Sequence, residues 1–179
     1  LRAKTFMAAQ KAQLAHWLTN EAFGLNVYYH LNQVRAGLRK KAAKSDITAV
    51  QFLHVDIDPR VGEDILTERE RILERLTDNQ PSDVPPPTAI VDSGAGFQAL
   101  WALADEIPID GDEAKAAEVE RYTRWLEGRF GADNCHNVDR VLRLPGTTNN
   151  PDEKKRKKGR TTATTAFVAL HSARLYGLE

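Results

Sequence analysis

The stretch Phe52-Leu53-His54-Val55-Asp56-Ile57-Asp58-Pro59 predicts a β-strand that ends in two carboxylates. Side chains alternate across a strand with a period of two, so Asp56 and Asp58 share one face, with His54 behind them. The apolar residues that alternate with these polar residues along the strand point to the opposite face, where they can be buried. Pro59 cannot donate to a sheet ladder, so we expect the strand to stop where the carboxylates stand.

This strand end is a candidate metal site. At 3.3 Å per residue, Asp56 and Asp58 lie about 7 Å apart on the same face, and they repel each other unless a cation lies between them. Hard oxygen ligands of this kind suit Mg²⁺ or Mn²⁺. The alternative is a plain strand end that carries two solvated aspartates, and the stretch alone leaves both interpretations open.

The chain has no net charge, yet its charges are unevenly distributed. The 25 Lys and Arg residues balance 25 Asp and Glu residues, and acids concentrate between Asp105 and Glu127. Basic side chains form one block at Arg35, Arg39, Lys40, Lys41 and Lys44, and a second at Lys154, Lys155, Arg156, Lys157, Lys158 and Arg160. Two basic blocks in a neutral protein favour a surface that binds a polyanion.

Length and composition predict one soluble globular domain of 179 residues, with the second basic block in a loop over 151–160. The single Cys135 excludes an internal disulfide, which fits a reducing cytoplasm. No apolar run reaches the ~18 residues of a membrane span, and no signal peptide is visible. Because the chain opens at Leu1 rather than Met, we expect it to be a fragment of a longer protein.

Hydrophobic periodicity predicts an α+β domain with a mixed or antiparallel sheet. The expected elements are a helix over 5–23, a strand over 26–31, a basic loop or arm over 32–44, a strand over 50–58, a helix over 63–76, a Pro-rich connector over 78–87, strands over 88–91 and 97–103, a helix over 112–130, a strand over 161–168 and a short helix to the end. In the helix over 63–76, the residues expected to point inward are Ile65, Leu66, Ile72, Leu73 and Leu76.

A second candidate site is Ser93-Gly94-Ala95-Gly96-Phe97-Gln98. Its turn residues join the strands over 88–91 and 97–103 into a hairpin, with Gln98 on the face opposite Phe97. Glycines allow backbone N–H groups to approach a phosphate closely, and a turn of such amides forms an anion nest. A Gly-rich hairpin turn is also common for purely structural reasons, so this motif is weak alone.

Asp139 and Arg143 form the third candidate. A lone Asp is most often a cap or a solvated side chain. Arg143 lies four residues further on, and its guanidinium could bind a phosphate if it faces the same site.

Together the three stretches resemble the archaeo-eukaryotic primase superfamily, in particular the primase-polymerase domains of plasmid and phage replication proteins. The matches are the Asp-x-Asp strand end, the hairpin from Ser93 to Gln98, the region Asp139-Arg140-Val141-Leu142-Arg143-Leu144-Pro145-Gly146-Thr147-Thr148-Asn149, and the strand at Asn26-Val27-Tyr28-Tyr29. The resemblance implies an RRM-like sheet with helices on its far face, an N-terminal αβ unit, and an active site between them.

The resemblance also implies template-directed nucleotidyl transfer, by a DNA primase, a DNA polymerase or both. Asp56, Asp58 and Asp139 would hold two Mg²⁺ or Mn²⁺ ions and act as catalytic residues. Nucleoside triphosphate would be bound by Ser93, Gly94, Gly96, Gln98 and Arg143. A single-stranded DNA template would be bound by Arg35, Arg39, Lys40, Lys41, Lys154, Lys155, Arg156, Lys157, Lys158 and Arg160.

The sequence departs from the family pattern at one position. The second motif usually ends in a His that contacts the nucleotide phosphates, and Gln98 stands there. Related plasmid and phage domains also carry Gln at this place. The chain holds no Gly-x-x-x-x-Gly-Lys-Ser/Thr motif, so a helicase partner must lie elsewhere in the full protein or on another chain.

Two other functions compete with this interpretation. A metal-dependent nuclease also uses Asp clusters and Mg²⁺, although no Lys follows the Asp pair closely, as many such enzymes need. A non-catalytic DNA-binding replication initiator could keep the fold without the chemistry. Incubation with labelled DNA, metal and nucleotides separates the three functions, because they predict elongation, degradation or binding alone.

Overall fold

The computed structural model describes residues 3–7, 9–157 and 159–178. In chain order its elements are α1 (Lys11–Asn20), β1 (Tyr28–His30), β2 (Gln33–Val34), the 3₁₀ turn η1 (Lys44–Asp46), β3 (Ile47–Ile57), α2 (Ile65–Leu76), β4 (Ala89–Asp92), β5 (Phe97–Pro108), α3 (Glu113–Phe130), β6 (Val141–Arg143), β7 (Thr148–Asn149), α4 (Glu153–Arg156), β8 (Ala163–Thr164), β9 (Ala166–Leu170) and β10 (Leu175–Tyr176). None of these helices is both long and apolar enough to cross a membrane.

The long strands β3 and β5 form the centre of the main sheet. Within the described residues its strand order is β2-β3-β5-β4-β9, with β10 added to β5. Every pair is antiparallel except β5–β10, which is parallel, so the predicted mixed sheet is confirmed. The register places Asp56 of β3 directly opposite Gln98 of β5.

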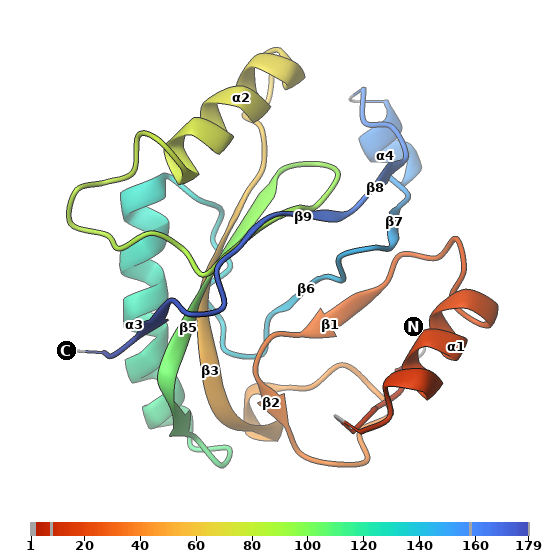
Figure 1. Cartoon of the computed structure of the whole chain (residues 1–179), viewed down its shortest axis with the longest axis vertical. Helices are drawn as coiled ribbons and strands as arrows, with labels where there is room; N and C mark the ends of the chain where they lie inside the picture. The colour runs from red at the N-terminus through yellow and green to blue at the C-terminus, as the bar shows by residue number, and fades with distance from the viewer. Residues whose placement is uncertain (1–2, 8, 158, 179) are drawn as a thin grey trace.

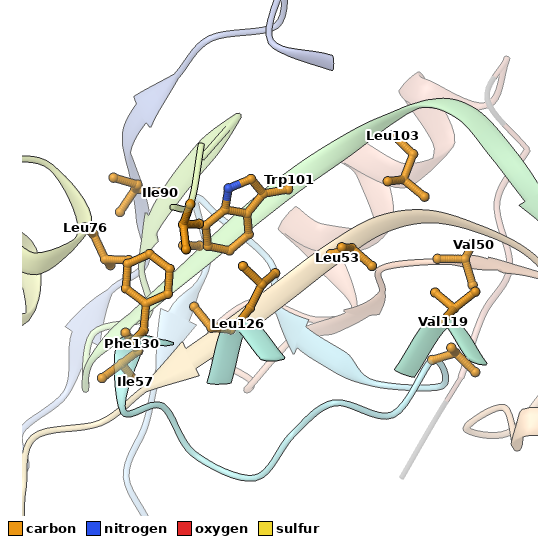
Figure 2. Close-up of a cluster of buried hydrophobic side chains, with 14 of the residues drawn as sticks. Val50, Leu53, Ile57, Leu76, Ile90, Trp101, Leu103, Val119, Leu126 and Phe130 are labelled. Carbon is orange, nitrogen blue, oxygen red and sulfur yellow. The ribbon is translucent and has the colours of Figure 1, made fainter. Parts of the chain in front are cut away.

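Helices α2 and α3 cover one face of this sheet (Figure 1). Figure 2 shows the core between them, where Trp101 of β5 lies against Phe130 of α3 with 5.6 Å between ring centroids. The Trp101 indole N–H also donates to the Pro85 carbonyl at 2.8 Å, which fixes the Pro-rich connector to the sheet. Val55 and Ile57, the apolar residues on either side of Asp56 in β3, belong to this core, as the alternation predicted.

The opposite face of the sheet carries a smaller unit. Strand β1 pairs with β6, and β7 pairs with β8. A second apolar cluster of Leu31, Ala89, Leu100 and Leu142 joins this unit to the sheet. The predicted αβ unit is therefore confirmed, but the segment after α3 supplies three of the four strands named here. The end of β3 lies between the two parts (Figure 1).

Several local predictions are wrong. The segment over 151–160, expected to be a loop, contains helix α4, because the Asp152 side chain accepts from the Lys155 N–H and caps it. Helix α1 begins at Lys11 instead of residue 5, because the segment before it folds back and places Phe6 5.8 Å from Trp17; Ala8 lies outside the described residues. Leu66 is 71% exposed instead of buried. The expected C-terminal helix is absent from the described residues up to 178, because β10 instead pairs with β5, a contact that local periodicity cannot reveal.

Candidate active site

The hairpin turn between β4 and β5 presses against the end of β3. A Cβ added at Gly96 would lie 2.0 Å from the Ile57 carbonyl oxygen and 2.8 Å from Asp58 Oδ1. Real Cβ atoms do not approach other atoms this closely, so position 96 requires glycine for this contact. The turn thereby lies directly beside the two carboxylates that the sequence singled out.

The Asp56 carboxylate is mostly enclosed and only partly compensated. Burial, followed by the nearby charge of Asp58, raises the pKa of Asp56 to about 6. Arg140 opposes this shift, because its Nη2 lies 3.2 Å from Asp56 Oδ2. Ionisation of the Asp56 carboxyl group is therefore less favourable in this environment than in water.

A third carboxylate, which the sequence analysis did not select, joins this strand end. The Asp133 N–H donates to the Asp56 carbonyl at 2.9 Å, and Asp133 Oδ2 accepts from the Asp58 N–H at 3.2 Å. Burial and the charge of Asp58 raise the pKa of Asp133. Asp56, Asp58 and Asp133 thus form the carboxylate group of the candidate site.

Asp139, the third carboxylate expected from the sequence, is placed differently. It precedes β6, and its Oδ2 lies 4.0 Å from Lys41 Nζ. Its charge also acts on His30 of β1, whose pKa is lowered chiefly by burial. Within the described part of the chain, no three His, Cys, Asp or Glu side chains are grouped closely enough to hold a metal ion. This applies to the expected trio with Asp139 and equally to Asp56, Asp58 and Asp133. The metal-binding role of Asp139 stays a prediction.

Two enclosed polar side chains accompany the carboxylates. Gln98, opposite Asp56, is 3% exposed, and Arg143 on β6 is 7% exposed. Counting only described residues, Gln98 Oε1 and Arg143 Nη1 have no hydrogen-bond partner. Burial lowers the pKa of Arg143, while the charges of Tyr28, Asp56 and Asp58 act in the opposite direction. Arg143 therefore lies within electrostatic reach of the carboxylates.

The amides of the hairpin turn are already engaged within the turn. The Gly94 N–H donates to Asp92 Oδ1 at 2.7 Å, and the Gly96 N–H donates to Ser93 Oγ at 3.1 Å. Ser93 Oγ in turn donates to the Gly96 carbonyl at 3.0 Å. These bonds give Ser93 and both glycines a structural role in the turn; their expected contact with a nucleotide stays a prediction.

The family of this chain follows from a family model that matches residues 2–174, described as the RepB DNA-primase N-terminal domain. The chain belongs to the RepB primase family. It is thereby a member of the archaeo-eukaryotic primase superfamily, among the primase-polymerases of plasmid and phage replication.

A solved structure agrees with this assignment at the level of the fold. The AEP domain of the cyanophage S-2L primase-polymerase superimposes on this RepB primase domain with a TM-score of 0.57. The match covers 93% of this chain and 71% of the cyanophage domain, at 16% sequence identity. No curated protein sequence matches the chain.

The basic residues of this RepB primase domain are exposed to different degrees. Arg35 pairs with Asp46 at 2.6 Å, Lys41 with Asp139, and Lys157 with Glu153 at 2.8 Å. These three basic side chains are nonetheless exposed, as are those of Arg39, Lys40, Lys154, Lys155 and Arg156. Lys158 lies outside the described residues. Their contact with DNA stays a prediction.

Asn149 is a further site residue that sequence reasoning missed as an individual position. It is buried on β7, and its Nδ2 donates to the Ser93 carbonyl at 2.7 Å. A Cβ on Gly94 would lie 3.2 Å from the Asn149 Cβ, so the two residues pack closely. Asn149 thus ties the smaller unit to the hairpin turn. The sequence signal that could have identified Asn149 was its position at the end of the region from Asp139 to Asn149, six residues after Arg143.

Proposed function

We propose that this domain is a template-directed nucleotidyltransferase that synthesises or extends DNA primers with two divalent metal ions. One observation carries the proposal. A group of carboxylates at the end of β3 lies opposite the enclosed Gln98 and within electrostatic reach of Arg143, whose Nη1 is a donor without a partner among the described residues. Acceptors for cations next to donors for phosphate are what a metal-bound triphosphate needs.

The donor set fits Mg²⁺ or Mn²⁺, because every candidate ligand is a hard carboxylate oxygen. The raised pKa values of Asp56 and Asp133 reflect negative charges that a cation would compensate. We assign the ligands to Asp56, Asp58 and Asp133, with Asp133 in place of Asp139. When bound, such ions lower the pKa of the attacking hydroxyl and neutralise charge that develops on the leaving pyrophosphate.

The remaining residues bind and orient the nucleotide. Arg143 donates to the triphosphate oxygens, and the Tyr28 ring, 4.3 Å from its guanidinium carbon, limits the rotation of that group. Gln98 donates its side-chain amide N–H to a neighbouring phosphate oxygen. Arg140 holds the Asp56 carboxylate in place. Gly96 keeps the turn close enough to Asp58 for these groups to converge.

The partners in this proposal are nucleoside triphosphates and a single-stranded DNA template. The exposed lysines and arginines of α4 and of the segment over 35–41 contact the template backbone without reading its sequence. Unwinding of the duplex is left to a helicase outside this chain.

The deciding experiment supplies a primerless single-stranded template with each nucleotide set and either Mg²⁺ or Mn²⁺. We expect labelled products to grow from the template, and an Asp56→Asn variant with an unchanged circular dichroism spectrum to make none. Degradation of labelled DNA would instead favour a nuclease. Binding without incorporation, under every metal and nucleotide condition, would favour a non-catalytic initiator.

A further inference from the structure

A hollow of about 250 Å³ opens beside the β4–β5 hairpin, between α2 and the segment over 159–163. Its walls come from three separate segments. Leu66 and Arg69 belong to α2, Asp92 lies at the end of β4, and Arg160 and Thr161 follow α4. The active-site carboxylates Asp56, Asp58 and Asp133 do not line the hollow, and neither do Gln98 and Arg143. The hollow is therefore distinct from the active site.

Arg69 is fixed in this hollow with part of its hydrogen-bonding capacity unused. Its Nη2 donates to Asp92 Oδ2 at 2.6 Å, and its guanidinium carbon lies 4.7 Å from the centre of the Phe97 ring. The other oxygen of Asp92 accepts from the Gly94 N–H, so both carboxylate oxygens are engaged. Arg69 Nη1 is enclosed and has no partner within the described residues. A buried donor without an acceptor is costly, which points to a ligand oxygen.

Arg160 adds a second positive charge and connects the hollow to the basic segment. Its Nη1 donates to the Ala95 carbonyl at 2.5 Å, which holds it against the hairpin turn. Exposed Lys154 and Lys155 lie on α4, only a few residues earlier in the chain. With Asp92 as the one acid in its lining, the hollow has a net positive charge of one, and further cations precede it along the chain.

The rim of the hollow also offers an apolar surface. Leu66 is 71% exposed on α2, although its neighbours along the helix are mainly polar. An exposed leucine beside two arginines is suited to a ligand that combines an apolar face with a phosphate. A nucleotide unit has this composition, because its base is flat and apolar on both faces.

We propose that the hollow binds one nucleotide unit of the single-stranded template, with its phosphate on Arg160 and Arg69 and its base against Leu66. The proposal rests on the function proposed above. A polynucleotide fits better than a free nucleotide, since the cations continue from the hollow into α4, where a strand would extend.

The position of the hollow gives this contact a role. Gly94 of the hairpin turn lines the hollow, while Gly96 of the same turn abuts Asp58. Only the β4–β5 hairpin turn therefore separates the bound template unit from the active-site carboxylates. A strand held there is anchored beside the site of nucleotide transfer.

A cysteine footprint tests the proposal directly. The single native cysteine, Cys135, is 1% exposed, and burial raises the pKa of its thiol to about 12, so an added exposed cysteine reacts alone. We expect a saturating oligo-dT strand to slow alkylation of Leu66→Cys at least tenfold. Val61→Cys is the matched control, since Val61 is 86% exposed and does not line the hollow.

Parallel reactions with a single deoxynucleoside triphosphate and with inorganic phosphate identify the source of the phosphate. Protection by the strand alone supports the proposal. Equal protection by either small molecule would overturn the assignment to a strand, and so would equal reactivity of Leu66→Cys with and without DNA. These outcomes are independent of nucleotide incorporation: a protein that is protected yet incorporates nothing contradicts the proposed function only.

A charge substitution gives a second measurement. Arg160→Gln should weaken oligo-dT binding about tenfold, as expected for one lost charge-assisted hydrogen bond. It should also reduce the salt slope of binding by about 0.7, the value for one phosphate contact on a single strand. Arg121→Gln removes the same charge from an exposed position on α3 and should change neither quantity. Identical affinities for the two variants would contradict the phosphate contact.

Discussion

The two faces of the central strands differ in how completely their side chains are satisfied. Toward α2 and α3, β3 and β5 present hydrocarbon and aromatic rings that are buried in one continuous core (Figure 2). Toward the smaller unit, the same strands present Asp56 and Gln98, and one of these has a raised pKa while the other has an enclosed oxygen without a partner among the described residues. Neighbouring positions of one strand therefore serve different purposes.

This difference teaches where the stability of the domain resides. Burial of apolar side chains on the helix side contributes about 1.5–3 kcal/mol for each large residue. Enclosed polar atoms and like charges on the other side oppose folding. Residues that weaken the fold without a ligand are expected to be the ones that bind it. The predictions below test this division by changing one face at a time.

The largest effect is expected from the carboxylates. Asp56→Asn and Asp58→Asn should each lower nucleotide incorporation by about a thousandfold or more, since metal-held charge contributes several kcal/mol to such reactions. Asp133→Asn should act similarly, whereas Asp139→Asn should retain most activity because Asp139 pairs with Lys41. Single-turnover incorporation of one nucleotide measures this. Loss of activity in the Asp139 variant, with retention in the Asp133 variant, would restore the original sequence assignment.

The core face should show the reverse pattern, with loss of stability. Trp101→Ala removes a side chain that is 2% exposed, contacts Phe130 and donates to the Pro85 carbonyl. We expect the free energy of unfolding to fall by about 3–5 kcal/mol. Trp125→Ala is the matched control, because this tryptophan is 45% exposed on α3 and should cost far less. Urea unfolding of both variants gives the comparison, and equal losses would argue against a core centred on Trp101.

The sequence predicted the two faces because strand alternation is a local property. The period of two assigned Val55 and Ile57 to the core and Gln98 to the face opposite Phe97, and the structure agrees. The glycine turn was equally visible. The close contact of Gly96 with Asp58 was not, since it depends on where a distant hairpin packs.

The choice between Asp133 and Asp139 shows where sequence reasoning ended. Both residues lie in the irregular segment between α3 and β6, and spacing alone favours neither. Our proposal of Asp133 rests on the path of the chain, because backbone hydrogen bonding joins Asp133 to Asp56 across 77 positions. The prediction of a C-terminal helix was wrong because it, too, could not include a long-range contact: Leu175 pairs with β5.

The next effect concerns pH and the metal-free protein. The pKa of Asp56 is about 6 when folded, above the ordinary value near 3.9, so its stabilising contribution is fully present below pH 3.9 and is lost as pH rises through 6. The loss amounts to about 3 kcal/mol at most, at 1.36 kcal/mol for each pKa unit. Asp56→Asn should therefore be more stable than wild type at pH 7.5 without metal, and the difference should vanish near pH 4.

Chemical denaturation of both proteins between pH 4 and 7.5, with a chelator present, measures this difference. Asp105→Asn serves as a control, because Asp105 is an exposed carboxylate on β5. Addition of Mg²⁺ should stabilise wild type and leave Asp56→Asn unchanged. A difference that is constant across the pH range would show that Arg140 compensates the charge of Asp56 fully.

The smallest and most specific effect is expected at Gln98. Its amide can donate to a phosphate oxygen, and a hydrogen bond to a charged group contributes about 1.5–3 kcal/mol. Gln98→Ala should therefore lower kcat/KM for the nucleotide by about 10- to 100-fold while template affinity stays unchanged. Gln98→Glu keeps the shape but places a negative charge beside the phosphates, so it should lose more activity than the alanine variant.

Gln98→His distinguishes a phosphate contact from a structural role of Gln98. An imidazole has a pKa near 6.5, so its positive charge grows as pH falls from 7.5 to about 6.5, and the activity of this variant relative to wild type should rise over that range. Activity is compared as the ratio to wild type, because Asp56, whose pKa is about 6 in the wild-type protein, also titrates near this range. If Gln98 only supported the sheet, Gln98→Ala would lower the melting temperature and leave the nucleotide KM and kcat at wild-type values. Measurement of both quantities on the same variants decides whether this enclosed side chain belongs to the stabilising face of the strands or to the binding face.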